Sequence, residues 1–145
     1  MASAQTDLIA LYSTRILALA ADIPHLGRLP NPHATATCKS PQCGSQVTVD
    51  IELQGDTISN FAQDVKACAL GQAAAAVFGQ HIIGCTRAKV ALAHQQLHQM
   101  LIDKAPPPDA PFADFVVLTP AQDFKNRHAS ILLTTQATLA AFDTF

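Results

Sequence analysis

Two cysteines flank the strongest strand pattern in the chain, and their surroundings suit metal or sulfur chemistry. Cys43 lies in the turn-forming segment 40–45 (SPQCGS), directly before that strand. Cys68 stands where a second strand is expected to end and an alanine-rich helix to begin. The positive end of a helix dipole favours a thiolate, and the thiolate is the form of cysteine that attacks sulfur and binds metal. We therefore interpret Cys43 and Cys68 as candidate ligands.

A histidine near the C-terminal helix completes a three-ligand set. Imidazole binds iron and zinc, as thiolate does, so Cys43, Cys68 and His128 would leave one open position on a tetrahedral metal. Spacing alone also allows a different interpretation, because the chain has no C-x-x-C pair and free cysteines are commonly small buried residues. The candidates for an additional ligand are Cys38, Asp64 and Ser45.

A hairpin is the element that would position the two cysteines. Residues 47–53 (VTVDIEL) alternate strictly, which predicts a strand with one buried face and one face in water. Residues 54–56 (QGD) supply a turn, and residues 57–64 return as a weaker strand. Ile58 and Phe61 are out of phase in that second strand, which indicates a bulge.

The ends of such a hairpin lie together, so it would bring Cys43 and Cys68 side by side. Residues 34–39 (ATATCK) are compatible with a third, edge strand. The remaining patterns predict a helix over residues 3–21, a helix over 69–79 ended by Gly79, a helix over 86–103 capped by Thr86, a proline-rich connector over 105–111, a short helix or strand over 112–119 ending at Pro120, and a last helix over about 127–142.

Composition fits one domain over residues 1–145, with an α+β fold in which a small three-stranded antiparallel sheet packs against several helices. Hydrophobic residues make up 49% and charged residues 14%, which argues against disorder. A net charge of −2 makes nucleic acid an unexpected partner. Apolar runs are too short to span a membrane, and Asp7 precedes the first basic residue, Arg15, unlike a secretory signal. We expect a cytoplasmic protein with reduced cysteines.

These same segments resemble the U-type iron–sulfur cluster assembly scaffolds, the IscU family and the N-terminal domain of NifU. The resemblance runs from about Tyr12 to Phe142. It rests on the SPQCGS turn before the alternating strand, the KACA turn over residues 66–69, and the start of the last helix over residues 127–132 (RHASIL). It implies a SufE/NifU-like fold.

The resemblance also implies a ligand set with two departures. The family builds a cluster on three cysteines, an aspartate and a histidine, and Cys43, Cys68 and His128 match the first cysteine, the second cysteine and the histidine. Ser45 stands at the aspartate position, and Ala129 stands at the third cysteine. Cys38 is the candidate for a substitute thiol.

A non-enzymatic cluster scaffold or carrier is the implied function. It would bind iron or a [2Fe–2S] cluster, receive sulfur from a cysteine desulfurase, share the cluster in a homodimer, and pass it to acceptor apo-proteins. The alternatives are a zinc-binding or sulfur-relay domain of the same fold that accepts persulfide, and an interaction module whose site is vestigial.

Overall fold

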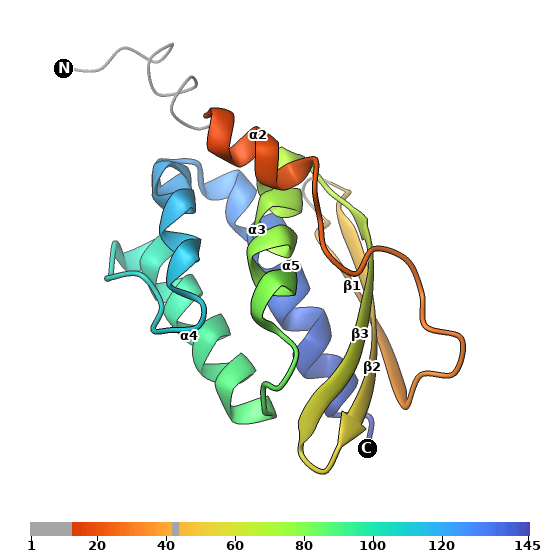
Figure 1. Ribbon diagram of the computed structural model, residues 1–145. Helices are drawn as coiled ribbons and strands as arrows, with labels where there is room; N and C mark the ends of the chain where they lie inside the picture. Colours follow the sequence, from red (N-terminus) through yellow and green to blue (C-terminus); the bar gives the residue numbers. More distant parts are fainter. Residues whose placement is uncertain (1–12, 42–43) are drawn as a thin grey trace, which may run out of the picture.

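The computed structural model describes residues 13–41 and 44–145, and it shows a sheet covered on one face by helices (Figure 1). Helices α3 and α5 pack together and α5 lies along the sheet, while α4 and η1 form an outer layer. The predicted α+β fold with a three-stranded antiparallel sheet is confirmed. In chain order the elements are α2 (Thr14–Ala20), β1 (Ala34–Lys39), β2 (Gln46–Gln54), β3 (Thr57–Lys66), α3 (Ala69–His81), α4 (Arg87–Asp103), the 3₁₀ helix η1 (Ala113–Asp123) and α5 (Lys125–Phe142).

The sheet has the order β1-β2-β3, and both strand pairs are antiparallel. The predicted hairpin is therefore present, and Gln46 at its start pairs with Lys66 at its end. The predicted bulge is also present: the register shifts between Glu52 and Leu53, so that Ser59 on β3 has no directly opposed residue. This register positions the candidate site, because it holds the start of β2 and the end of β3 side by side.

The outer face of β2 is less exposed than its alternation predicts. Val49 and its neighbours on the inner face are buried against the helices, but Thr48 and Asp50 on the other face are buried as well. The Asp50 carboxylate accepts hydrogen bonds from the Arg28 guanidinium and the Leu29 backbone N–H, which come from the segment between α2 and β1. The expectation of a water-exposed face fails here because that proline-rich segment folds across it.

The helices mostly follow the sequence pattern. Thr86 caps α4 as expected, its hydroxyl accepting from the Lys89 N–H. Gly79 does not end α3, which continues to His81. A Cβ at Gly79 would lie 2.8 Å from Gln63 Nε2 and 3.2 Å from the Pro24 carbonyl oxygen, so this glycine serves close packing.

One other predicted boundary differs, and one lies outside the described residues. η1 continues past Pro120 to Asp123, so the proline does not end the element. Most of the helix predicted over residues 3–21 lies outside the described residues, which include only its last part as α2. No helix in the described ranges is long and apolar enough to cross a membrane.

Candidate metal site

Cys68 is the N-cap residue of α3 and follows β3 by two residues. Its thiol is half-buried, and its Sγ lies 3.5 Å from the hydroxyl of Ser130 on the second turn of α5. A strand end, a helix start and a second helix thus fix the position of this thiol. The expectation of a partly accessible cysteine at a helix N-terminus is met.

Ser130 connects Cys68 to the start of the hairpin. Its Oγ lies 3.0 Å from the Oγ of Ser45, and both serines are buried. Gly71 on α3 allows this contact, because a Cβ there would lie 2.5 Å from Ser130 Oγ. The serine pair and Cys68 therefore form one polar cluster where β2, α3 and α5 meet.

Cys43 lies outside the described residues, but the ends of its loop are described. The Ser40 N–H donates to the Ser45 carbonyl at 2.8 Å, and the Gly44 N–H donates to the Ser40 carbonyl at 3.0 Å. Gly44 has a φ of 69°, a left-handed conformation that glycine adopts without strain. The loop that carries Cys43 therefore begins and ends beside the hairpin end that leads to Cys68.

His128 lies on the first turn of α5, but its ring points away from Cys68. Its Nε2 donates to the Ala121 carbonyl of η1 at 2.9 Å, since a carbonyl oxygen can only accept. Positions two apart on a helix differ by about 200°, so Ser130 faces Cys68 while His128 faces η1 and α4. In the neutral ring, this bond leaves the lone pair on Nδ1.

The three candidates for an additional ligand are held in separate places. Cys38 pairs with Val47 and packs against the core, and burial raises the pKa of its thiol. Asp64 pairs with Thr48, and the Thr48 hydroxyl bonds to the Thr37 hydroxyl. These three side chains form a row on the face of the sheet away from the helices. Ser45 is bonded to Ser130.

Within residues 13–41 and 44–145, no three His, Cys, Asp or Glu side chains lie close enough together to hold a metal ion. This statement does not include Cys43, which is central to the predicted site. The fourth cysteine, Cys85, is buried with its Sγ donating to the His81 carbonyl, and burial raises the pKa of its thiol.

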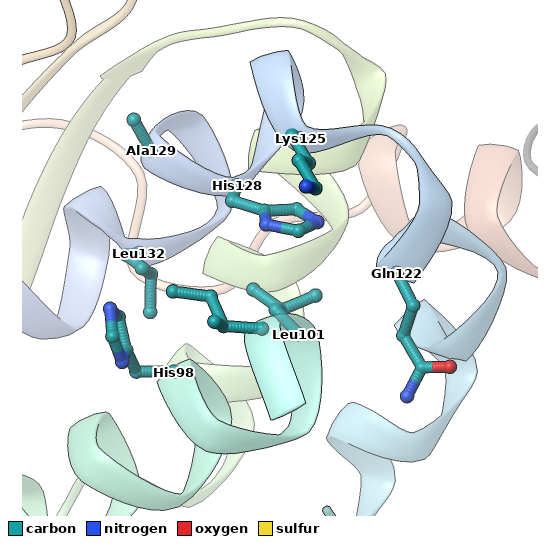
Figure 2. Close-up of a pocket in the computed structure, with 8 residues that line it drawn as sticks. His98, Leu101, Gln122, Lys125, His128, Ala129 and Leu132 are labelled. Atoms are coloured by element: carbon teal, nitrogen blue, oxygen red, sulfur yellow. The ribbon is translucent and has the colours of Figure 1, made fainter. Parts of the chain in front are cut away.

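A cavity of about 460 Å³ opens beside the start of α5 (Figure 2). His128 and Ala129 line it from α5, and His98 lines it from α4. Leu101 and Leu132 give it apolar walls, and both are buried. Sequence patterns did not indicate this cavity.

Comparison with known proteins identifies the family. The model of the NifU-like N terminal domain matches residues 11–130. The chain belongs to this family. A crystal structure of a nitrogen-fixing NifU-like protein (N-terminal) from Brucella abortus is 38% identical, with a TM-score of 0.91 over 94% of this chain and 95% of that one.

A second solved structure has the same fold at lower identity. It is a putative iron–sulfur cluster assembly scaffold protein for the SUF system from Fervidobacterium islandicum, 23% identical, with a TM-score of 0.80 over 92% of this chain and 97% of that one. Among curated proteins, no significant match was found. The family resemblance stated from the sequence is confirmed.

Sequence reasoning did not single out Ser130. The signal was available, since Ser130 follows His128 by two positions and so faces the other side of the helix. Gly71, the single glycine at the start of an alanine-rich helix, indicates a close helix contact but not its partner. The long-range contact itself could be seen only in the folded chain.

Proposed function

We propose that this protein is an iron–sulfur cluster assembly scaffold or carrier, which holds iron or a cluster through Cys43, Cys68 and His128 and passes it to acceptor proteins. One observation carries the proposal: the Cys68 thiol is partly accessible at a helix N-terminus, beside the hairpin end from which the Cys43 loop departs. Membership of the NifU-like family and the named role of the Fervidobacterium structure support it.

The surroundings of Cys68 suit a thiolate ligand. The dipole of α3 favours negative charge at its first residues. The Ser130 hydroxyl, 3.5 Å away, can donate to the sulfur while its oxygen accepts from Ser45. Hydrogen bonds to ligand atoms orient metal ligands in proteins. This serine pair would therefore hold the Cys68 sulfur in one direction.

His128 has the hydrogen-bond pattern of a ligating histidine. Such residues usually donate one ring N–H to a carbonyl or carboxylate, which fixes the tautomer that leaves the other nitrogen to bind metal. His128 donates from Nε2 to the Ala121 carbonyl, so Nδ1 is the ligand atom in this proposal.

The cargo is iron or a [2Fe–2S] cluster, with sulfur supplied as persulfide by a cysteine desulfurase. A homodimer would share one cluster between two ligand sets, and acceptor apo-proteins would receive it. The chain itself catalyses no turnover in this account, and it works in the cytoplasm.

A second function uses the same residues. Zinc binds thiolate and imidazole as iron does, so a mononuclear zinc site is the main competitor. A sulfur relay needs only one accessible thiol, and the partial exposure of Cys68 favours that residue as persulfide acceptor.

The test is anaerobic reconstitution with ferrous iron and sulfide, followed by visible absorption and circular dichroism. We expect Cys43→Ala and Cys68→Ala to abolish the cluster bands, and His128→Ala to weaken them. Cys85→Ala is the matched control, because it removes a core thiol that makes no contact with Ser130 or Cys68. Equal cluster content in Cys68→Ala and Cys85→Ala would overturn the proposal, and zinc uptake without sulfide in the wild type would favour the second function.

A further inference from the structure

Two histidines stand one turn apart on α4, on the side of the helix that faces α5. His94 contacts Thr135 of α5, and His98 lines the cavity beside α5, where Figure 2 shows its ring near Leu132. Side chains four positions apart on a helix lie on the same face, with their Cβ atoms about 5–6 Å apart. With this spacing a helix can present two imidazoles to a single metal ion.

Hydrogen bonding fixes the tautomer of His94. Its Nδ1 lies 2.6 Å from the hydroxyl oxygen of Thr135, and that hydroxyl donates its single proton to the Leu132 carbonyl oxygen at 3.0 Å. Because the hydroxyl has no second proton to give, both bonds form together only if Nδ1 of His94 is the donor. The lone pair of the neutral ring is therefore on Nε2. Metal-ligating histidines usually have this arrangement, in which one ring nitrogen donates to the protein and the other binds the ion.

His98 is the adaptable partner of the pair. It forms no hydrogen bond or ion pair with the rest of the described chain, so either of its ring nitrogens can carry the lone pair. Burial lowers the pKa of His94 and the neighbouring His98 lowers it further, which indicates that the two rings are close enough to interact. His98 is exposed, so an ion in solvent has access to the pair.

Positive charge lies at the other end of the cavity. The contacts between α4 and α5 run in opposite directions along the two helices, so His94 meets Thr135, whereas Leu101 shares the cavity with Lys125. Thr135 and Lys125 are ten positions apart on α5, which is about 15 Å along its axis. The lysine charge is therefore far from the His94 ring and opposes a cation there only weakly.

We infer that His94 and His98 form a second metal site, which chelates one divalent ion of a late first-row transition metal (copper, nickel or zinc) through two imidazole nitrogens. The donors select this class, because imidazole suits these metals whereas Mg²⁺ and Ca²⁺ prefer oxygen ligands. No third His, Cys, Asp or Glu side chain of the described ranges joins the pair, so water is left to fill the other positions on the metal. The site does not depend on Cys68 or on the scaffold function.

The test uses the full chain with Cys43→Ala and Cys68→Ala, so that the proposed cluster ligands cannot bind the probe. Zn²⁺ and Ni²⁺, which do not oxidise thiols, are titrated into this metal-free protein by calorimetry, and Mg²⁺ is the negative probe. We expect one Zn²⁺ or Ni²⁺ per chain and no binding of Mg²⁺. His98→Gln should weaken binding by about tenfold or more, because even the loss of a group that only orients a ligand typically costs that much.

A shifted histidine provides the matched control. Adding Gln99→His to His98→Gln restores the number of histidines but places them five positions apart, about 140° around the helix. Positions 98 and 99 are both exposed, so neither change should affect folding. The shifted protein should bind Zn²⁺ and Ni²⁺ as weakly as His98→Gln alone. In the parent protein, Zn²⁺ should shift the ring NMR signals of both His94 and His98.

The outcomes also separate this site from the proposed cluster site. Zinc that remains in Cys68→Ala and is lost in His98→Gln supports the α4 site, whatever the protein does with iron and sulfide. Zinc that is lost entirely in Cys68→Ala would overturn it. Equal affinity of the parent protein and the shifted protein, or unchanged His94 ring signals at saturating Zn²⁺, would overturn it as well.

Discussion

Gly71→Ala tests the contact that joins α3 to α5 beneath Cys68. The new Cβ would lie 2.5 Å from Ser130 Oγ, 2.8 Å from Ala67 Cβ and 3.1 Å from the Ser130 carbonyl oxygen, all closer than ordinary contact. Ser130 cannot rotate away at no cost, because its hydroxyl bonds to Ser45 and contacts the Cys68 sulfur. Either the hydroxyl loses these partners or the two helices separate.

The magnitude follows from three contributions. Alanine in place of glycine within a helix contributes about 1 kcal/mol of stability. Overpacking typically costs about 1–3 kcal/mol, and each hydrogen bond lost costs about 1 kcal/mol more. We therefore expect Gly71→Ala to lower the free energy of unfolding by about 1–3 kcal/mol, and the melting temperature by about 2–4 °C for each kcal/mol.

Urea unfolding monitored by circular dichroism measures the change in the free energy of unfolding. Repeating the substitution in a Ser130→Ala protein tests whether the contact with the Ser130 hydroxyl causes that change. Removing the hydroxyl relieves the shortest contact, so Gly71→Ala should cost less in Ser130→Ala than in the wild type, with a coupling of about 1 kcal/mol. A Gly71→Ala protein as stable as the wild type, or more stable, would refute the reasoning, since helix propensity would then outweigh the contact.

Three further predictions concern other parts of the fold. Burial opposes ionisation of Asp50, but hydrogen bonds from Arg28 and two other donors outweigh it and hold the pKa of Asp50 below its ordinary value. This stabilisation is present above a pH of about 4 and is lost as the pH falls through the lowered pKa of Asp50. In urea unfolding, Asp50→Asn should therefore be about 2–4 kcal/mol less stable than the wild type at pH 7, and this difference should shrink below pH 4. A difference that stays constant with pH would contradict this. Thr86→Ala removes the acceptor for the Lys89 N–H and should cost about 1 kcal/mol in thermal unfolding, with no loss expected only if the cap is not formed. Partial burial raises the pKa of the Cys38 thiol, so mass spectrometry should show that its alkylation by iodoacetamide begins at a higher pH than in the unfolded chain. The same pH profile in both states would contradict this.

Local patterns predicted the hairpin and its bulge because both depend on the alternation of neighbouring residues. Thr86 was predicted as a cap for the same reason, since its hydroxyl bonds to an N–H three residues away. The hairpin was also enough to predict that the segments beside Cys43 and Cys68 meet. Cys43 itself lies outside the described residues, so its distance from Cys68 stays a prediction.

Long-range packing accounts for what the sequence did not indicate. Asp50 alternates like an exposed residue, and only the path of a distant loop brings Arg28 onto it. Gly79 has the position of a residue that ends a helix, but the close approach of Gln63 and Pro24 explains why glycine stands there. The orientation of His128 depends on η1, whose 3₁₀ geometry the pattern of residues 112–119 did not specify.

The most direct test of the central claim is the iron and acid-labile sulfide content of the wild-type protein purified without oxygen. Iron and sulfide in equal amounts, with visible absorption bands that disappear in Cys68→Ala and persist in Cys85→Ala, are the result that a cluster scaffold predicts. Protein that contains neither iron nor sulfide, and that takes up neither on anaerobic reconstitution, would contradict the account.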